Sequence, residues 1–199
     1  MQISHYIGEF ERYFPQARTL MPWHIPGKAQ ELIRILMANL TDDYRVSGEI
    51  AIHKEALVED GVVLKGPIII SDKVFIGAHA YLRGGVYLAP NVSVGPGCEI
   101  KSSIIMPHSA LAHFNFVGDS ILGTHVNMEA GSIIANYHND RSDRTITVKD
   151  GQRIIRTDVQ KFGGLIGDGS KIGANAVLSP GTILPKNFIV KRLELIQQS

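Results

Sequence analysis

The stretch Ile52 to Met106, IHKEALVEDGVVLKGPIIISDKVFIGAHAYLRGGVYLAPNVSVGPGCEIKSSIIM, carries an aliphatic residue or Met at every sixth position. These positions are Ile52, Val58, Leu64, Ile70, Ile76, Leu82, Leu88, Val94, Ile100 and Met106. Gly and Pro punctuate the intervals, as expected of tight turns. A period of six fits neither an α-helix nor a hairpin sheet. It predicts short parallel strands wound into a β-solenoid, with every sixth residue pointing inward.

After Met106 the pattern slips. It is expected to resume at Phe116, Leu122, Met128 and Ile134, and again at Ile166, Ile172, Leu178 and Leu184. This repeat resembles that of the hexapeptide-repeat proteins. The resemblance implies an all-β fold, a single-stranded left-handed parallel β-helix with three hexads per turn. The left hand is implied by the resemblance alone, because the general rule for parallel crossovers favours the right hand.

Two segments lie outside the repeat. Residues 1–45 lack it, and PGKAQELIRILMAN, residues 26–39, has helical spacing, so we expect a short N-terminal helical cap that covers the open edge of the first coil. Residues 46–199 form the predicted β-helix domain. Within it, residues 138–165 contain TITV and RIIR around an Asp-Gly turn, which predicts a projecting β-hairpin arm.

Composition limits the function classes. The 199 residues include 20 Lys and Arg against 19 Asp and Glu, a formal charge of +1 without blocks of like charge, so neither nucleic acid nor a membrane surface is indicated as a partner. The N-terminus lacks the pattern of an export signal and Cys98 is the single cysteine, which together favour a cytoplasmic protein.

Polar residues interrupt the aliphatic repeat most clearly in AHFNFVGDSILGTHVNMEAGSIIANY, residues 112–137. With YLR at 81–83 and EIK at 99–101, this segment resembles the acetyltransferase domain of bifunctional N-acetylglucosamine-1-phosphate uridyltransferase, also called glucosamine-1-phosphate acetyltransferase. KFGGLIGDGSKIGANAVLSPG, from Lys161, and the longer arm resemble archaeal sugar-1-phosphate nucleotidylyltransferases that end in the same prism. No glycine-rich nucleotide-binding loop precedes the repeat, so we expect no nucleotidyl transfer.

The chemistry of acyl transfer to an amine needs a base, donors for the oxyanion and a clamp on the acceptor. His113 suits the base, because an imidazole exchanges its proton near neutral pH. Arg83 and Lys101 are 18 residues apart, one coil of three hexads, so they are predicted to stack on one face as a phosphate clamp.

The resemblance implies a role for each matching residue. It places His113 as the catalytic base and Arg83 and Lys101 on the acceptor's phosphate. It places Glu99 and Asn127 on the sugar or its amine, and Phe116 where the family has a Tyr that contacts the sugar. Contacts to acetyl-CoA, the acyl-donor substrate, are implied for Ala130, Asn136, Tyr137 and Ala174.

Further departures from the family pattern concern the donor side. Met128 and Glu129 replace an Ile-Gly pair, which adds bulk and charge near the thioester. The repeat ends one coil sooner than in the family, and Lys186, Lys191 and Arg192 are candidates to pair with the phosphates of coenzyme A.

The predicted function is a coenzyme-A-dependent N-acetyltransferase that acts on an aminosugar 1-phosphate. The resemblance implies a homotrimer, in which the arm would reach a neighbouring subunit. Two alternatives stay open. His108 and His113 have the spacing of the zinc-binding pair of γ-class carbonic anhydrases, with His79 as a third ligand. The other alternative is a non-catalytic trimeric scaffold or sugar-nucleotide-binding module. No metal is expected in the main interpretation.

Overall fold

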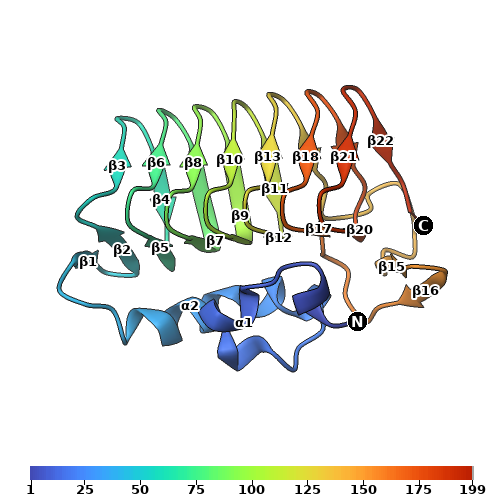
Figure 1. Cartoon of the computed structure of the whole chain (residues 1–199), viewed down its shortest axis with the longest axis horizontal. Coiled ribbons are helices and arrows are strands. Elements are labelled where there is room, and N and C mark those ends of the chain that lie inside the picture. The colour runs from blue at the N-terminus through green and yellow to red at the C-terminus, as the bar shows by residue number, and fades with distance from the viewer. Residues whose placement is uncertain (199) are drawn as a thin grey trace.

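The computed structural model describes residues 1–198, and residues from β2 onward wind into a solenoid of parallel strands (Figure 1). Each coil contributes a strand to three faces. The first face contains β2 (Ile50–His53), β5 (Ile68–Ile70), the C-terminal parts of β7 (Tyr81–Leu88) and β9 (Glu99–Ile105), β12 (Ile121–Leu122), β17 (Gly164–Ile166) and β20 (Thr182–Leu184).

The second face is a seven-stranded sheet of β3 (Leu57–Val58), β6 (Phe75–Ile76), β8 (Ser93–Val94), β10 (Ala110–Leu111), β13 (Asn127–Met128), β18 (Lys171–Ile172) and β21 (Ile189–Val190). The third face contains β4 (Val63–Lys65), the N-terminal parts of β7 and β9, β11 (Phe116–Gly118), β14 (Ile133–Ile134), β19 (Val177–Leu178) and β22 (Leu195–Ile196). The parallel β-helix predicted from the period of six is confirmed.

The repeat runs as predicted up to Ile100, and most of its residues form the buried core. Within β9 the register shifts by one residue, so Ile105, and not the predicted Met106, pairs with Leu88. Phe116 is an exception to the predicted phase. Val117 is the fully buried residue of β11, and Phe116 lies outward, in register with Glu99 and Ile133. The cause is that Ile100 pairs with Val117, which makes this coil 17 residues long where the preceding one has 18.

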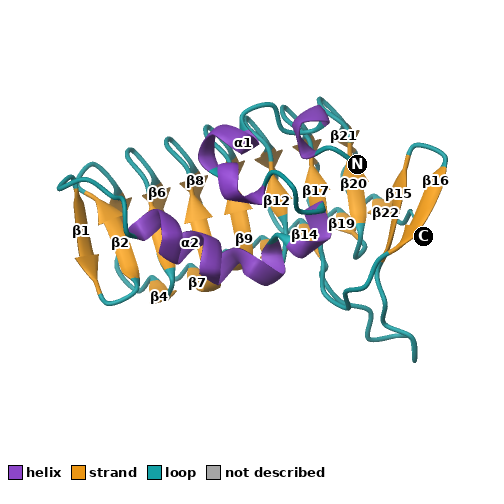
Figure 2. Cartoon of the chain, turned by 90° about the horizontal axis from the view of Figure 1, so that it is seen from below, coloured by secondary structure: helices purple, strands orange, loops and turns teal. Residues whose placement is uncertain are grey.

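The N-terminal segment lies along the side of the solenoid (Figure 2). It contains α1 (Phe10–Tyr13), α2 (Ala29–Met37) and short 3-10 turns, and α2 contacts β5, β7 and β9. The outward residues of the first face are apolar and buried, as in sheets covered on both sides. They are Ile69, Tyr87, Ile104, Ile121, Leu165 and Ile183. The N-terminal segment adds four buried residues to the same core, namely Phe10, Phe14, Ile25 and Ile33.

The helix was expected to cover the open edge of the first coil, and that expectation is wrong. The edge is covered by β1 (Tyr44–Ser47), which pairs antiparallel with β2. The helix lies on the first face because that face is apolar on its outer side too. Gly85 permits the approach of α2, since a Cβ there would lie 2.8 Å from the amide nitrogen of Gln30.

The arm leaves the solenoid after β14 and returns at β17. It carries the antiparallel hairpin β15 (Thr147–Asp150) and β16 (Arg153–Arg156), which confirms the hairpin predicted around the Asp-Gly turn. Two contacts fix it to the N-terminal segment of the same chain. The Tyr6 hydroxyl donates to Asp150 at 2.9 Å, and His24 Nε2 lies 2.6 Å from the Asp158 carboxylate. Burial and the Asp150 contact raise the pKa of Tyr6 to about 12.

No helix among residues 1–198 is long and apolar enough to cross a membrane.

His138, at the base of the arm, makes stability depend on pH. Its side chain is only 5% exposed and its Nε2 has no hydrogen-bond partner within the described chain. Burial lowers its pKa, Arg141 lowers it further, and Asp140 partly opposes both. The folded protein therefore holds His138 neutral at a pH where the unfolded chain takes up a proton.

We expect the free energy of unfolding to fall as pH drops below about 6.5, because the unfolded state then binds more protons than the folded state. Urea unfolding at about pH 7.5 and about pH 5.5 measures this change. The His138→Gln variant should lose most of the pH dependence in that window. If the free energy of unfolding of the variant depended on pH as steeply as that of the wild type, this account of His138 would be contradicted.

Candidate active site

A pocket of about 490 Å³ opens on the third face beside the base of the arm. Five residues predicted from the sequence line it: Arg83, Lys101, Phe116, Asn136 and Tyr137. The register explains the grouping, since Arg83 of β7 pairs directly with Lys101 of β9. The arm adds Gln160 and Lys161 to the wall. The stacking of the two cations, predicted from their spacing of 18, is observed.

The two stacked cations of the pocket are each held by a carboxylate. Nε and Nη2 of Arg83 donate to one oxygen of Glu99 at 2.9 and 2.7 Å, and Lys101 Nζ lies 2.5 Å from Asp119. Asn136 also donates to Asp119. The Asp119 side chain is 8% exposed and that of Lys101 is 17% exposed, so this second pair is largely shielded from water. Glu99, assigned by resemblance to the sugar, therefore fixes the orientation of Arg83 in this structure.

Gly118 follows Lys101 in the same row of the third face. A Cβ at this position would lie 2.8 Å from the Asn136 amide and 2.9 Å from the Phe116 ring. Glycine lets both side chains close over the backbone at the floor of the pocket.

The turns between the second and third faces bring three further predicted residues into one row. The carbonyl of His113 accepts from the N–H of Gly131 at 2.8 Å, that of Ala130 from Asn175 at 3.0 Å, and that of Ala174 from Leu193 at 2.9 Å. His113, Ala130 and Ala174 thus occupy equivalent places in successive coils, and we call them the turn column. His113 is exposed and lies just before β11, at the other edge of the third face from Lys101.

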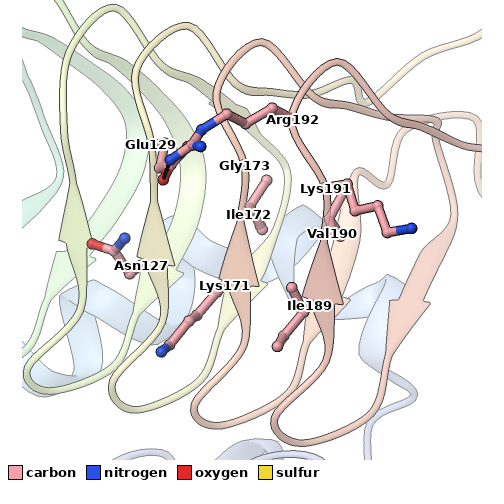
Figure 3. A pocket seen from close by; sticks show the side chains of 9 residues that line it. All are labelled: Asn127, Glu129, Lys171, Ile172, Gly173, Ile189, Val190, Lys191 and Arg192. Carbon is pink, nitrogen blue, oxygen red and sulfur yellow. Dashed lines mark hydrogen bonds and ion pairs between the residues drawn. The ribbon is translucent and has the colours of Figure 1, made fainter.

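A second pocket, of about 510 Å³, lies on the second face beside the turn column (Figure 3). It contains Asn127, which within one chain does not line the pocket of Arg83 and Lys101. Glu129 accepts from the backbone N–H of Ala174 at 2.8 Å and from two nitrogens of Arg192 at 2.7 Å each. Arg192 first, and then the Ala174 N–H, lower the pKa of Glu129.

The cations considered for the phosphates of coenzyme A are in different places. Lys191 lines the second pocket, together with Lys171, which was not predicted from the sequence as a site residue. Arg192 is engaged by Glu129, and Lys186 pairs with Asp168 at 3.2 Å and lines neither pocket.

The amide N–H of Ala130 has no acceptor within the described chain, whereas that of Ala174 is held by Glu129.

The histidines of the zinc alternative are not close to one another. His108 lies in the turn before β10 and stacks on His125 at 4.8 Å, whereas His113 follows β10 at its other end. Among residues 1–198, no group of three His, Cys, Asp or Glu side chains is placed to hold a metal ion. The structure of the single chain gives this alternative no support.

The parallel coils, the period of six and the turns define the class: the chain is a hexapeptide-repeat β-solenoid protein. It is similar to "Bifunctional protein GlmU" of Methanococcus vannielii, with 33% identity over 173 residues that cover 85% of this chain and 41% of that protein. It is equally similar, at 33% over 145 residues, to a bifunctional sugar-1-phosphate nucleotidylyltransferase/acetyltransferase of Sulfurisphaera tokodaii, covering 73% of this chain and 36% of that protein.

Residues 64–161 also match the family model described as the GMPPB C-terminal domain. A solved structure of a mutant perosamine N-acetyltransferase from Caulobacter crescentus, in complex with CoA and GDP-perosamine, aligns at 16% identity and a TM-score of 0.32, covering 81% of this chain and 60% of that one. The resemblance to bifunctional acetyltransferases inferred from the motifs is confirmed by the curated relatives. The chain spans less than half the length of these relatives.

Proposed function

We propose that this protein transfers an acetyl group from acetyl-CoA to the amine of an aminosugar 1-phosphate. The observation that carries the proposal is the arrangement of the third face, with stacked Arg83 and Lys101 at one edge and His113 at the other. A small phosphorylated amine bound on this face has its phosphate at the cations and its nitrogen toward the imidazole. The acetyltransferase relatives agree with this reaction class.

His113 acts as the base in the proposed mechanism. The amine nitrogen attacks the thioester carbonyl, a C–N bond forms, and the imidazole takes the proton from the nitrogen. The backbone N–H of Ala130, one coil further along the turn column, donates to the oxyanion. The C–S bond then breaks, and the proton passes from His113 to the sulfur of coenzyme A, which leaves as the free thiol.

Binding residues follow from the same geometry. Arg83 and Lys101 hold the phosphate, oriented by Glu99 and Asp119. Asn136 and Tyr137, which the resemblance implies as donor contacts, lie in the pocket of the clamp, at the edge of the third face opposite His113. Ala174, Lys171 and Lys191 bind the donor on the second face, with its acyl end at the turn column beside His113 and Ala130. We further propose a cytoplasmic homotrimer, in which Asn127 reaches the acceptor from a neighbouring subunit.

The experiment is a panel of aminosugar phosphates incubated with acetyl-CoA while free thiol is measured. Thiol release that depends on the acceptor supports the proposal. No release with any acceptor, together with no thermal stabilisation by coenzyme A, would favour the non-catalytic scaffold.

Glu129 provides a test of the donor site. Replacing it with Ala frees the Ala174 N–H and Arg192 for the phosphates of coenzyme A, so the Kd for coenzyme A should fall roughly tenfold by calorimetry. Glu59→Ala is the matched control, because Glu59 makes the same bond to the N–H of Ala78, at 2.7 Å, further toward the N-terminus. Weaker or unchanged binding in Glu129→Ala would show that the donor does not lie there.

A further inference from the structure

The row that contains Arg83 and Lys101 includes a third cation. Lys65 of β4 pairs in register with Arg83 of β7, as Arg83 does with Lys101 of β9. Neighbouring strands are about 4.8 Å apart, so the three side chains leave the third face at successive steps of that length. The row therefore continues by one coil beyond the pocket, toward the N-terminal end of the solenoid.

The ring of Tyr81 holds the first two cations together. Lys65 Nζ lies 5.1 Å from its centroid, and the guanidinium carbon of Arg83 lies 5.7 Å from the same centroid. Both distances are within the range of cation–π attraction. The aromatic ring thus keeps Lys65 beside Arg83 without neutralising either of them.

The charges in the row are balanced unequally. Arg83 is paired with Glu99 and Lys101 with Asp119, whereas Lys65 is exposed and has no carboxylate partner within the described chain. A phosphate between Arg83 and Lys101 leaves the charge of Lys65 unused. A second phosphate, joined to the first through one oxygen, would lie between Lys65 and Arg83.

We infer that the third face binds a diphosphate, and that the acceptor is an aminosugar joined to a diphosphate, with Lys65 holding the phosphate further from the sugar. The inference about the acceptor rests on the proposed acyl transfer, whereas diphosphate binding does not. Nucleoside diphosphates and lipid diphosphates share this chemistry.

Binding of inorganic pyrophosphate and of inorganic phosphate, measured by calorimetry, tests the row directly. Lys65→Ala should weaken pyrophosphate binding about tenfold and leave phosphate binding unchanged, and Lys65→Arg should retain pyrophosphate binding. Lys28→Ala removes one exposed charge from the N-terminal segment and serves as the control. The inference would be overturned if Lys65→Ala lost affinity equally for both anions or lost none. It would also be overturned if Lys28→Ala lost as much affinity for pyrophosphate as Lys65→Ala.

Kinetics identify the acceptor. With UDP-glucosamine, Lys65→Ala should raise KM about tenfold at unchanged kcat, and with glucosamine 1-phosphate it should leave KM unchanged. UDP and farnesyl diphosphate as competitors distinguish the nucleoside from the lipid source. If no acceptor releases thiol, the proposed function fails while the pyrophosphate measurement still decides the binding site. If only the monophosphate reacts, the acceptor inference fails and acyl transfer stands.

Discussion

Substituting Ala for His113 is expected to reduce kcat by about 10²- to 10⁴-fold, the usual contribution of a general base. The imidazole is exposed and at the edge of the third face, three residues before Phe116. Its removal leaves the cations and the amide of Ala130 in place. Coenzyme A binding and the unfolding temperature should therefore change little, because an exposed side chain contributes little to the core.

Chemical rescue makes this prediction sharper. The vacated site of His113→Ala is open to solvent, so added imidazole should restore part of the turnover. Activity equal to that of the wild type in the variant would remove His113 from the mechanism. A variant that loses both turnover and coenzyme A binding would show that His113 acts in binding.

Substituting Ala for Lys101 is expected to affect both stability and acceptor binding. Asp119 is largely buried and loses its charged partner, keeping only the Asn136 donor, at a cost of about 3 kcal/mol in the free energy of unfolding. The acceptor loses one of its two clamp cations, so KM should rise at least about tenfold. Urea unfolding and acceptor kinetics measure the two effects separately.

The double variant Lys101→Met with Asp119→Asn separates stability from binding. It removes both charges, and Asn tolerates the φ of +45° at position 119. Stability should return close to that of the wild type, while KM for the acceptor stays high. If the double variant recovers a normal KM as well, Lys101 acts only through the fold.

The fold could be predicted to a large extent from the sequence because each coil repeats the same local rule, an inward aliphatic residue and a turn. The prediction failed where two distant segments meet. The side-on position of α2 depends on the buried outer surface of the first face, including Tyr87 and Ile104, and no local pattern reports which outward apolar residues are covered.

The candidate site could be predicted where it depends on the repeat, and not where it depends on the arm or on side-chain orientation. A spacing of 18 brought Arg83 and Lys101 together, and the same spacing, applied once more, identifies Lys65. Gln160 and Lys161 could not be placed, because their position depends on how the arm folds back. Asp119 was also missed as the partner of Lys101, since this bond depends on side-chain orientation as well as register.

The most direct measurement follows the acyl group itself. The protein is incubated with acetyl-CoA labelled with ¹³C in the acetyl group and with an aminosugar phosphate, and the product is examined by mass spectrometry and NMR. The account predicts that the label appears on the amine nitrogen of the acceptor with the wild-type protein and is nearly absent with His113→Ala. Label on a hydroxyl oxygen, or acceptors that stay unlabelled throughout the panel, would contradict it.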